Sequence, residues 1–475
     1  MMVVHQAFRF ELDPSDRTRS ALASHCGAAA FAYNWGLGLV AGRLEDGRVL
    51  TVLALRQGAS AADGEAWARE MVGPVPWSLP ALRREWNRSK AEVAPWWAEN
   101  SKEAYNSGLD ALARALGNFF DSRTGRRRGA TVGFPRRKKR GRSRRSCRFT
   151  TGALGVVDRR HIRLPRIGVV RTKEPADALL RRLGEGTVRV LSATVSEDAG
   201  RWCVSFGCEV QRQDRRARRP GSVVGVDLGV RWLATLSTGE HVPNPKPLDR
   251  YARRIARLSR QRARQQAGSG RSRRTRARLA RCHRRAANLR RDSVHKLTSR
   301  LAATYGTVVV EDLNVRGMTA APKPRPDGRG GHGVNGRAAK AGLNRAVLDA
   351  APAEVRRQLT YKVAWRRGTL VVAGRWFPSS KLCSSCGAVK TKLPLHERVY
   401  RCDKCGLVID RDVNAASNLA ALGRRALSVA GSGPETENAR GGAHPRPRSD
   451  APVNREDGTA EADKTVTAAG QPAAA

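Results

Sequence analysis

The chain has 475 residues, and its 89 Lys and Arg against 42 Asp and Glu give a formal net charge of +47. Only 15 of the basic residues are Lys, and arginine is the residue that holds phosphate with a planar fork of donors. A charge this large calls for a polyanionic partner, so nucleic acid is expected; at 40% hydrophobic residues the chain is not a disordered polycation. No segment approaches the ~20 apolar residues that cross a bilayer, and the N-terminus lacks an apolar signal core. We therefore expect a cytoplasmic, nucleoid-associated protein with no membrane partner.

The first 212 residues are predicted to be mainly helical, with strands at both ends. Residues 3–10 alternate loosely and indicate a strand, after which residues 16 to about 121 have helical character. One helix face carries apolar residues spaced 4, 3, 4 and 3 apart, namely Tyr105, Leu109, Leu112, Leu116 and Phe119. Short apolar stretches predict a small β-domain, at 162–164, 167–170, 187–191 and 202–208.

The second half of the chain alternates short apolar strands with helices. Its predicted elements are strands at 223–226, 232–236 and 307–310, a Gly- and Pro-rich loop at 319–342, a helix from about 344 to 365 and a strand at 370–372. After Arg425 almost no large apolar residue remains, so a disordered tail is expected.

Two stretches concentrate the positive charge. Residues 123–148 hold 13 Lys or Arg and no acid, and residues 250–291 hold 17 Arg with neither Lys nor acid. Residues 265–270 divide the second stretch into two arms, which predicts an antiparallel helical hairpin coated with arginine. Because charge of this density destabilises an isolated helix, we expect both stretches to contact the backbone of a nucleic acid.

Four cysteines have the spacing of a metal site. Two Cys-x2-Cys pairs stand fifteen residues apart, with a glycine after each, at Cys383, Cys386, Cys402 and Cys405. This pattern is typical of a four-thiolate zinc ribbon, whose closed coordination makes the zinc structural. Tetrahedral coordination by four sulfurs also suits iron, so the spacing alone does not name the metal, and zinc is the metal we expect. The remaining cysteines are scattered and are expected to be inert buried thiols: Cys26, Cys147, Cys203, Cys208 and Cys282.

Three carboxylates follow or adjoin predicted strands. Asp227 ends one apolar strand, Glu311 ends another, and Asp412 opens the helix after the cysteine pairs. Three acids converging on one point cannot all ionise without a cation, and hard oxygen ligands with open positions suit Mg2+ or Mn2+. Each acid alone is weak evidence, since a strand-terminal Asp before Gly is more often a turn residue. In a chain built for nucleic acid, the set predicts metal-assisted attack on a phosphodiester.

The sequence around these acids falls into three runs: Val224-Gly225-Val226-Asp227-Leu228-Gly229, Val308-Val309-Val310-Glu311-Asp312-Leu313-Asn314-Val315 and Asp410-Arg411-Asp412-Val413-Asn414-Ala415-Ala416-Ser417-Asn418. They resemble the three motifs of RuvC-like nucleases on the RNase H fold. Residues 379–383 and the cysteine ribbon precede the third motif. With that arrangement, residues 5 to about 422 resemble TnpB, the OrfB family of insertion-sequence proteins, which is akin to type V CRISPR effectors. Looser matches lie at 31–35, 133–135, 243–245, 292–297 and 359–362.

The resemblance implies a multi-domain α+β fold. It comprises a helical recognition region, a small β-barrel-like wedge domain and a RuvC/RNase H-like α/β nuclease domain with an inserted zinc ribbon. The implied segments are a wedge strand at 1–11, the recognition region at 12–125, the wedge β-domain at 126–212, the nuclease at 220–424 with its ribbon at 376–409, and a disordered tail at 425–475.

The resemblance also implies an RNA-guided DNA endonuclease. Its guide RNA would come from the transposon end, and its substrate would be double-stranded target DNA. The triad that binds magnesium or manganese carries over as Asp227, Glu311 and Asp412. Asp412 is preferred to Asp410 because the matching acid stands two residues before Asn414.

Two alternatives differ in reaction. One is a transposon-associated, RNA-guided DNA-binding protein or a transposase accessory that does not cut DNA. Such a protein should have lost one of these acids, and all three are present. A transposase that joins DNA ends would need a Tyr nucleophile beside a metal-binding His pair. The six Tyr show no such setting, and His283 and His295 lie in the basic helical region.

Overall fold

The computed structural model describes residues 2–430 of the chain except 214, 329, 330, 334 and 395. The chain divides into two units, residues 1–426 and 427–475. Nearly all of the tail expected at 425–475 lies outside the described residues. Its first six residues are helical, because the last helix, α11, runs from Arg411 to Ala430. None of the helices in the described part of the chain has both the length and the apolar character needed to span a membrane.

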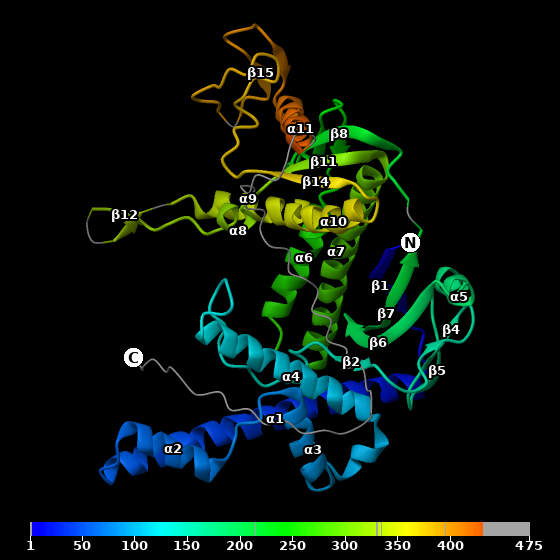
Figure 1. Ribbon diagram of the computed structural model, residues 1–475, viewed down its shortest axis with the longest axis vertical. Coiled ribbons are helices and arrows are strands. Elements are labelled where there is room, and N and C mark those ends of the chain that lie inside the picture. Colours follow the sequence, from blue (N-terminus) through cyan, green and yellow to red (C-terminus); the bar gives the residue numbers. More distant parts are fainter. Residues whose placement is uncertain (1, 214, 329–330, 334, 395, 431–475) are drawn as a thin grey trace, which may run out of the picture. The chain divides into compact units, whose positions relative to one another are not determined.

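The N-terminal half combines helices with antiparallel strands (Figure 1). Its elements are β1 (Met2–Glu11), α1 (Asp16–Arg56), α2 (Ala61–Val72), α3 (Leu79–Val93), the 3-10 helix η1 (Pro95–Glu99), α4 (Lys102–Arg123), β2 (Ser146–Phe149), β3 (Gly155–Val156), β4 (His161–Leu164), β5 (Gly168–Arg171), α5 (Asp177–Gly184), β6 (Val188–Asp198) and β7 (Arg201–Arg212). They form a four-stranded sheet in the order β1-β7-β6-β2 and a three-stranded sheet in the order β3-β4-β5.

Serine side chains begin the four longer helices of this half. Ser15, Ser60, Ser78 and Ser101 each accept a hydrogen bond from a backbone N–H in the first turn of α1, α2, α3 and α4. Such caps satisfy amides that the helix itself leaves unpaired. The expected continuous helical region is therefore divided at residues that the capping rules identify.

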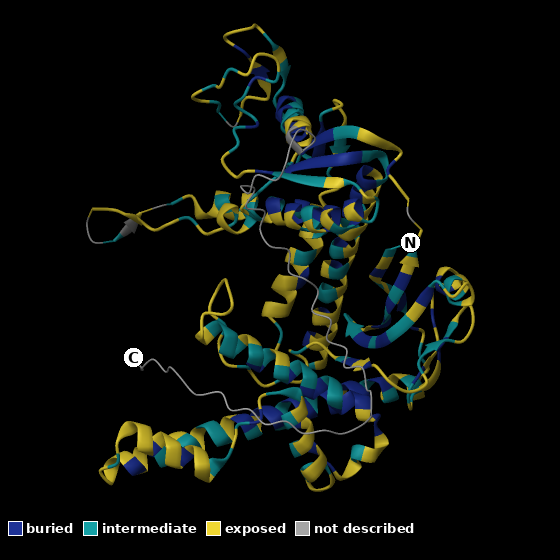
Figure 2. Ribbon diagram, viewed as in Figure 1, coloured by how far each residue is buried: buried dark blue, intermediate teal, exposed yellow. Residues whose placement is uncertain are grey.

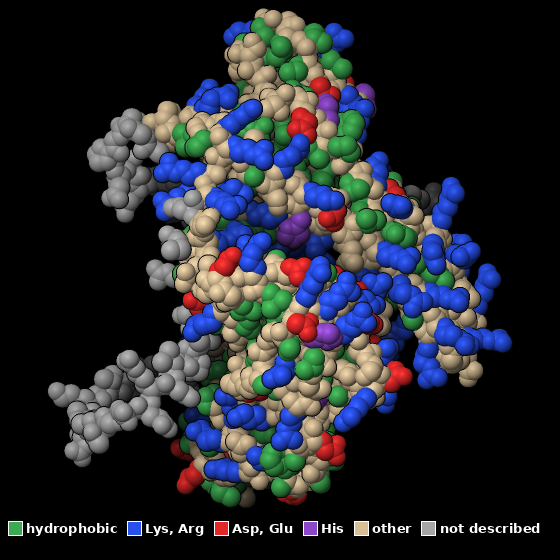
Figure 3. Space-filling model, turned by 90° about the vertical axis from the view of Figure 1, so that its right-hand side faces the viewer, with side chains coloured by type: hydrophobic (Ala, Val, Ile, Leu, Met, Phe, Trp, Pro, Cys, Tyr) green, Lys and Arg blue, Asp and Glu red, His purple; other side chains and the backbone are tan. Residues whose placement is uncertain are grey.

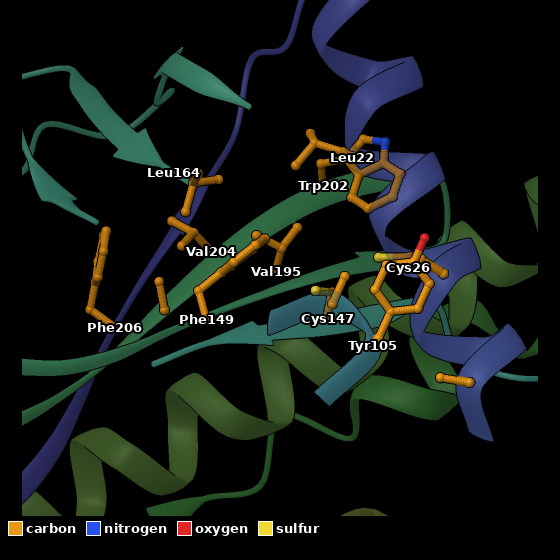
Figure 4. Packing of buried hydrophobic residues seen from close by; sticks show 14 of the residues in the cluster. Leu22, Cys26, Tyr105, Cys147, Phe149, Leu164, Val195, Trp202, Val204 and Phe206 are labelled. Atoms are coloured by element: carbon orange, nitrogen blue, oxygen red, sulfur yellow. The ribbon is translucent and has the colours of Figure 1, made fainter. Parts of the chain in front are cut away.

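One hydrophobic core joins these helices to the four-stranded sheet (Figure 4). Leu22 of α1 and Tyr105 of α4 belong to the same cluster as Phe149, Trp202 and Phe206 of the strands. The predicted apolar stripe on α4 faces this core, and its first four members are at most 1% exposed. The last member, Phe119, is only half-buried and contacts the ring of Phe134. Residues 2–212 thus share one core, although the sequence indicated separate helical and β segments.

The C-terminal half is built on a five-stranded mixed sheet. Its elements are β8 (Arg219–Asp227), β9 (Trp232–Leu236), β10 (His241–Pro243), α6 (Pro247–Ala263), α7 (Gly270–Thr304), β11 (Tyr305–Glu311), α8 (Val315–Met318), β12 (Arg325–Pro326), β13 (His332–Gly333), α9 (Arg337–Ala350), α10 (Pro352–Ala364), β14 (Thr369–Ala373), β15 (Val399–Arg401), β16 (Val408–Asp410) and α11. The sheet has the order β10-β9-β8-β11-β14, in which β8, β11 and β14 run parallel.

Helices cover both faces of this sheet, which leaves its central strands β8 and β11 buried (Figure 2). On one face, Val226 and Val310 pack with Leu301 of α7 and Leu359 of α10. On the other face, Val309 packs with Leu419 of α11 and its neighbours. Strands buried on both sides have continuous apolar runs, which is why the sequence showed these strands clearly.

Two differences from the predicted elements have local causes. The helix expected from 344 to 365 is two helices, α9 and α10, because Pro352 cannot continue a helix. The preceding residue, Ala351, takes the left-handed conformation at φ 52° and separates them. The predicted loop at 319–342 contains the short hairpin β12–β13, and α9 begins inside it.

Candidate functional site

Two of the three predicted acids leave the sheet side by side. Asp227 ends β8 and Glu311 ends β11, and these parallel strands pair in register at Val226 and Val310. The carboxyl ends of neighbouring parallel strands lie at one edge of a sheet. The third acid, Asp412, is in the first turn of α11, which packs on the face of the same sheet.

Gly225 lets α11 approach this sheet closely. A Cβ at this position would lie 1.9 Å from the carbonyl oxygen of Ala416 and 2.5 Å from the amide nitrogen of Ala420. Any side chain at 225 would therefore push the helix away from β8. The glycine two residues before Asp227 thus helps to set how near Asp412 comes to the strand acids.

The electrostatics of the three acids are coupled. Burial, then the charges of Glu311 and Asp412, raise the pKa of Asp227 from 3.8 to about 8, while Arg411 opposes the rise. A divalent cation would relieve this repulsion, and carboxylates are the ligands that Mg2+ and Mn2+ prefer. The donor set therefore fits such an ion. The three carboxylates do not, however, form a preassembled cluster as tight as the cysteines below, which are the one such group among the described residues.

Asp410 and Asp412 have different surroundings. The Oδ1 atom of Asp410 accepts hydrogen bonds from the backbone amides of Asp412 at 2.9 Å and Val413 at 3.1 Å. Asp410 thus caps the first turn of α11. One oxygen of Asp410 bonds to the helix backbone, and the choice of Asp412 as the metal-binding acid stays a prediction.

Glu311 and α11 are both tied to the segment that leads into the cysteine ribbon. Buried Ser379 donates from Oγ to Oε1 of Glu311. Asn418 donates from Nδ2 to the carbonyl oxygens of Ser379 at 2.8 Å and Leu382 at 2.7 Å. This segment therefore bonds to the strand acid on one side and to the helix that carries Asp412 on the other.

Asn414 makes a second connection one turn earlier on α11. It donates from Nδ2 to the carbonyl oxygen of Leu382 at 2.7 Å and accepts from the amide of Ser384 at 3.0 Å. Asn414 and Asn418, the asparagine pair, are 0% and 3% exposed. Both asparagines belong to the third motif, and Ser379 belongs to the run at 379–383, but the sequence did not indicate what these residues do. The one feature that could have indicated a structural role is their spacing. Two amide side chains four residues apart lie on the same face of a helix, and a buried amide needs hydrogen-bond partners.

The four predicted zinc ligands come together. Their sulfur atoms all lie within 4.8 Å of one another, with Cys383 Sγ 3.7 Å from Cys405 Sγ and Cys386 Sγ 3.6 Å from Cys402 Sγ. A tetrahedral zinc with Zn–S bonds of about 2.3 Å separates its sulfurs by about 3.8 Å. These distances fit a four-thiolate metal site and are too long for disulfides.

The two cysteine pairs have matching backbone turns. Gly387 and Gly406 follow them with φ of 75° and 74°, in the left-handed region that glycine adopts freely. Backbone amides of Cys405 and Lys404 lower the pKa of Cys402, which favours the thiolate that binds metal. The amide of Ala388 lowers the pKa of Cys386, but burial and the neighbouring thiols outweigh it and raise that pKa. The other cysteines are buried and free, as expected. Burial raises the pKa of Cys26 to about 12.

The predicted arginine hairpin is formed by α6 and α7, which lie side by side (Figure 1). Between them is a cavity of about 640 Å3 whose lining contains no acid: Arg254, Arg257, Leu258, Arg260, Gln261, Arg264, Gln265 and Arg278. Figure 3 shows Lys and Arg side chains over much of one face of the molecule, with few acids among them. A cavity with this lining suits phosphate groups.

The other basic stretch, residues 123–148, is anchored to the helices. Asn34 of α1 pairs through its amide with the backbone of Lys138, accepting at 2.7 Å and donating at 3.0 Å. The ammonium group of Lys138 lies 4.2 Å from the ring centre of Tyr33. Arg276 of α7 donates to the carbonyl oxygen of Gly141, so the two basic stretches are in direct contact.

Comparison with known proteins identifies related chains along most of this sequence. Three family models match: the OrfB model of the IS605 group, described as "Probable transposase", at residues 205–321, a Cas12f1-like TNB domain at 353–419 and a helix-turn-helix domain at 1–47. A solved complex of Cas12f1 with sgRNA and target DNA has 12% identity and a TM-score of 0.44, and covers 88% of this chain and 99% of that one.

Full-length relatives are more similar. A Mycobacterium tuberculosis protein provisionally named an RNA-guided DNA endonuclease is 41% identical over 429 residues, which cover 87% of this chain and 86% of the relative. A Streptomyces pristinaespiralis protein with the same provisional name is 36% identical, covering 93% and 95%. Its Escherichia coli counterpart, InsQ, is 30% identical, covering 89% and 93%. The chain belongs to the OrfB (TnpB) family of insertion-sequence proteins.

Proposed function

We propose that this chain is an RNA-guided DNA endonuclease that hydrolyses phosphodiester bonds at the Asp227, Glu311 and Asp412 site. The observation that carries the proposal is the placement of two acids at the ends of adjacent parallel strands, with the third on the helix that Gly225 lets approach. The provisional names of the full-length relatives support the same activity. We further propose that the five-stranded sheet and its helices form a RuvC-type, RNase H-like core.

The residues divide the chemistry between them. Divalent ions bound by the three carboxylates would activate water and stabilise the leaving oxygen. Asp227 can hold such an ion only after losing the proton that its raised pKa retains at neutral pH. Ser379 donates a hydrogen bond to one oxygen of Glu311, which fixes the orientation of this carboxylate. Asp410 holds the first turn of α11 so that Asp412 is presented from a rigid helix.

Guide RNA and double-stranded DNA are the proposed partners, with the RNA derived from the transposon end. In guide-dependent nucleases, base pairing identifies the target while the protein binds the backbone of the nucleic acid. The acid-free cavity of the α6–α7 hairpin and the anchored stretch at 123–148 suit that task because they present arginine without competing carboxylates. The four cysteines are proposed to hold one structural zinc ion.

The proposal is tested by cleavage of a matched target. RNA that copurifies with the chain is sequenced, and a DNA duplex matching its guide segment is incubated with the complex and Mg2+. Asp227→Ala, Glu311→Ala and Asp412→Ala should each reduce cleavage at least a hundredfold, since each removes a metal ligand, while RNA and target binding persist. Glu240→Ala, which removes an exposed partner of Arg300, is the matched control and should cut normally.

Two outcomes would contradict the nuclease assignment. Cleavage that continues in Asp227→Ala, or in a chelator of divalent ions, would show that the carboxylate site is not responsible. Tight, guide-dependent binding by the unaltered chain with no cleavage would support the alternative of a guided DNA-binding protein.

A further inference from the structure

Trp376 is the most exposed large hydrophobic side chain among the described residues. It is 89% exposed, whereas the next, Met71, is 63% exposed. Large aromatic rings in folded proteins normally bury much of their surface. A tryptophan held in solvent therefore calls for a partner that covers it.

The fold places Trp376 at the edge that carries the acids. Strand β14 runs parallel to β11, with Ala373 opposite Glu311. The chain that leaves β14 therefore emerges where Asp227 and Glu311 end their strands. Three residues beyond Trp376, Ser379 donates its hydrogen bond to Glu311.

The residues on either side of Trp376 are anchored. Phe377 donates its backbone amide to the carbonyl oxygen of Gly374 at 3.0 Å, and its side chain packs with Val309 and Leu419. On the other side, Arg375 pairs with Asp312 at 3.5 Å. The segment is thus a fixed turn, and the indole is exposed because both neighbours are held to the sheet.

We propose that Trp376 is a stacking platform for an unpaired nucleobase of the DNA strand at the carboxylate site. The inference rests on the proposed function, which it deepens by naming how the strand is held. A single ring suffices to stack one base, whichever base it is. A protein partner would instead need a contiguous apolar patch. The residues beside Trp376 do not provide one, since Phe377 is half-buried and Gly374 and Arg375 are its other neighbours.

The surroundings favour nucleic acid as the occupant. Arg375 precedes the ring directly, and Arg356 of α10 also pairs with Asp312, so two guanidinium groups lie beside the turn. A base can stack on a protein ring only after it has left its neighbours in the duplex. Trp376 would therefore hold a strand that is already open, with its phosphates next to the three acids.

The first test separates binding from chemistry. In the RNA-loaded complex, Trp376→Ala should raise the KM for the cleaved strand about five- to a hundredfold, the range that base–aromatic stacking supports, with a smaller change in kcat. Trp376→Phe keeps an aromatic face and should restore most of the affinity. Val169→Ala, which removes an exposed apolar side chain of β5 in the three-stranded sheet, is the control and should leave both constants unchanged. Equal KM values for Trp376→Ala and the unaltered chain would overturn the proposal.

The second test does not depend on cleavage. 2-Aminopurine, whose fluorescence is quenched by stacking, is placed in turn at each position of the DNA strand in uncut Asp227→Ala complexes. One or two positions should be quenched, and Trp376→Ala should remove that quenching. The assignment to DNA would be overturned if Trp376→Ala changed the quenching only when the probe is placed in the guide RNA. It would also be overturned if Trp376→Ala changed the quenching at no position. If the unaltered chain fails to cleave, the proposed function fails, and this fluorescence measurement still decides the stacking.

Discussion

At the scale of single residues, the negative charge of Asp227 is strongly unfavourable in the metal-free fold. Its pKa of about 8 in the folded chain, against 3.8 for the free side chain, means that the fold retains a proton which the unfolded chain releases. The cause is burial reinforced by two other acids. A site of this kind stores repulsion that a metal ion can relieve, at some expense to the stability of the metal-free fold.

This repulsion should make the stability of the chain without added Mg2+ depend on pH. Between about pH 4 and pH 8 the folded state binds more protons than the unfolded state, so the free energy of unfolding should fall as pH rises. The slope from one group is at most about 1.4 kcal/mol per pH unit. Denaturant unfolding at pH 5, 6, 7 and 8 measures it.

Asp227→Asn should remove most of that slope and stabilise the metal-free chain at pH 8. Glu240→Gln, at an exposed acid, is the control and should keep the slope. Added Mg2+ should stabilise the unaltered chain more at pH 8 than at pH 6, because the ion competes with the proton. An identical pH dependence in Asp227→Asn would contradict this account.

At the scale of elements, the cysteine ribbon and α11 form one unit with the carboxylate site. The asparagine pair bonds α11 to residues 379–384, and Ser379 bonds that segment to Glu311. Ser379 and the asparagine pair are buried, so leaving one of their partners unpaired would be costly. Removing one bond should therefore alter both stability and catalysis.

Asn418→Ala should lower the free energy of unfolding by about 1–3 kcal/mol, because it removes the side-chain donor to the carbonyl group of Ser379 and one of the two donors to that of Leu382. It should also lower kcat on the order of tenfold to a hundredfold through displaced acids. Ser417→Ala, at the adjacent half-buried position, is the control. Normal kcat in an Asn418→Ala chain that has lost stability would show that the pair supports the fold alone.

The ribbon itself should hold about one zinc ion per chain. Elemental analysis of purified protein measures the ratio, and Cys383→Ser or Cys405→Ser should abolish it, because each removes one of four ligands. Cleavage should fall with the zinc, since the asparagine pair joins the ribbon to α11. Cys282→Ser, at a buried free thiol outside the cluster, should retain the metal. Folded chain without any zinc would refute the assignment.

At the scale of the whole molecule, the charge of +47 is organised. The two acid-free stretches are far apart in the sequence but meet where Arg276 bonds to Gly141. Asn34 and Tyr33 hold the first of them against α1. A long, fixed basic surface of this kind releases many counterions when it binds a nucleic acid.

Affinity for guide RNA and target should therefore fall steeply with salt. Replacing Arg254, Arg257, Arg260, Arg264 and Arg278 by Gln should reduce the slope of log K against log salt by about 0.7–0.9 for each phosphate that the variant no longer neutralises. Five exposed arginines around β4, β5 and α5 provide a control matched in charge: Arg159, Arg160, Arg163, Arg171 and Arg181. Equal reductions in the two variants would indicate a diffuse effect of charge and contradict a localised site.

Much of this arrangement was predictable because it is local. Apolar runs such as 307–310 correctly predicted buried strands. The spacing of the cysteines predicted that four thiols lie together, and the structure confirms this. The break at Ala351 was missed although Pro352 signalled it, because the apolar pattern continues across it. The roles of Ser379, Asn414 and Asn34 depend on partners far away in the sequence, which no local pattern reports. That Asp227, Glu311 and Asp412 bind the catalytic metal stays a prediction for the cleavage assay.

The close packing of α11 on β8 also bears on how the protein is made. The backbone of Ala416 in α11 lies directly against Gly225 of β8. The ribosome adds Ala416 to the chain long after it has added Gly225. Strand β8 therefore waits with one face uncovered until α11 has been synthesised, and its partner β11 likewise lacks the cover of Leu419 until then. The carboxylate site cannot close on a nascent chain until the helix carrying Asp412 has left the ribosome. A messenger truncated before this helix would yield a protein that keeps its arginine hairpin but has no complete site for cutting.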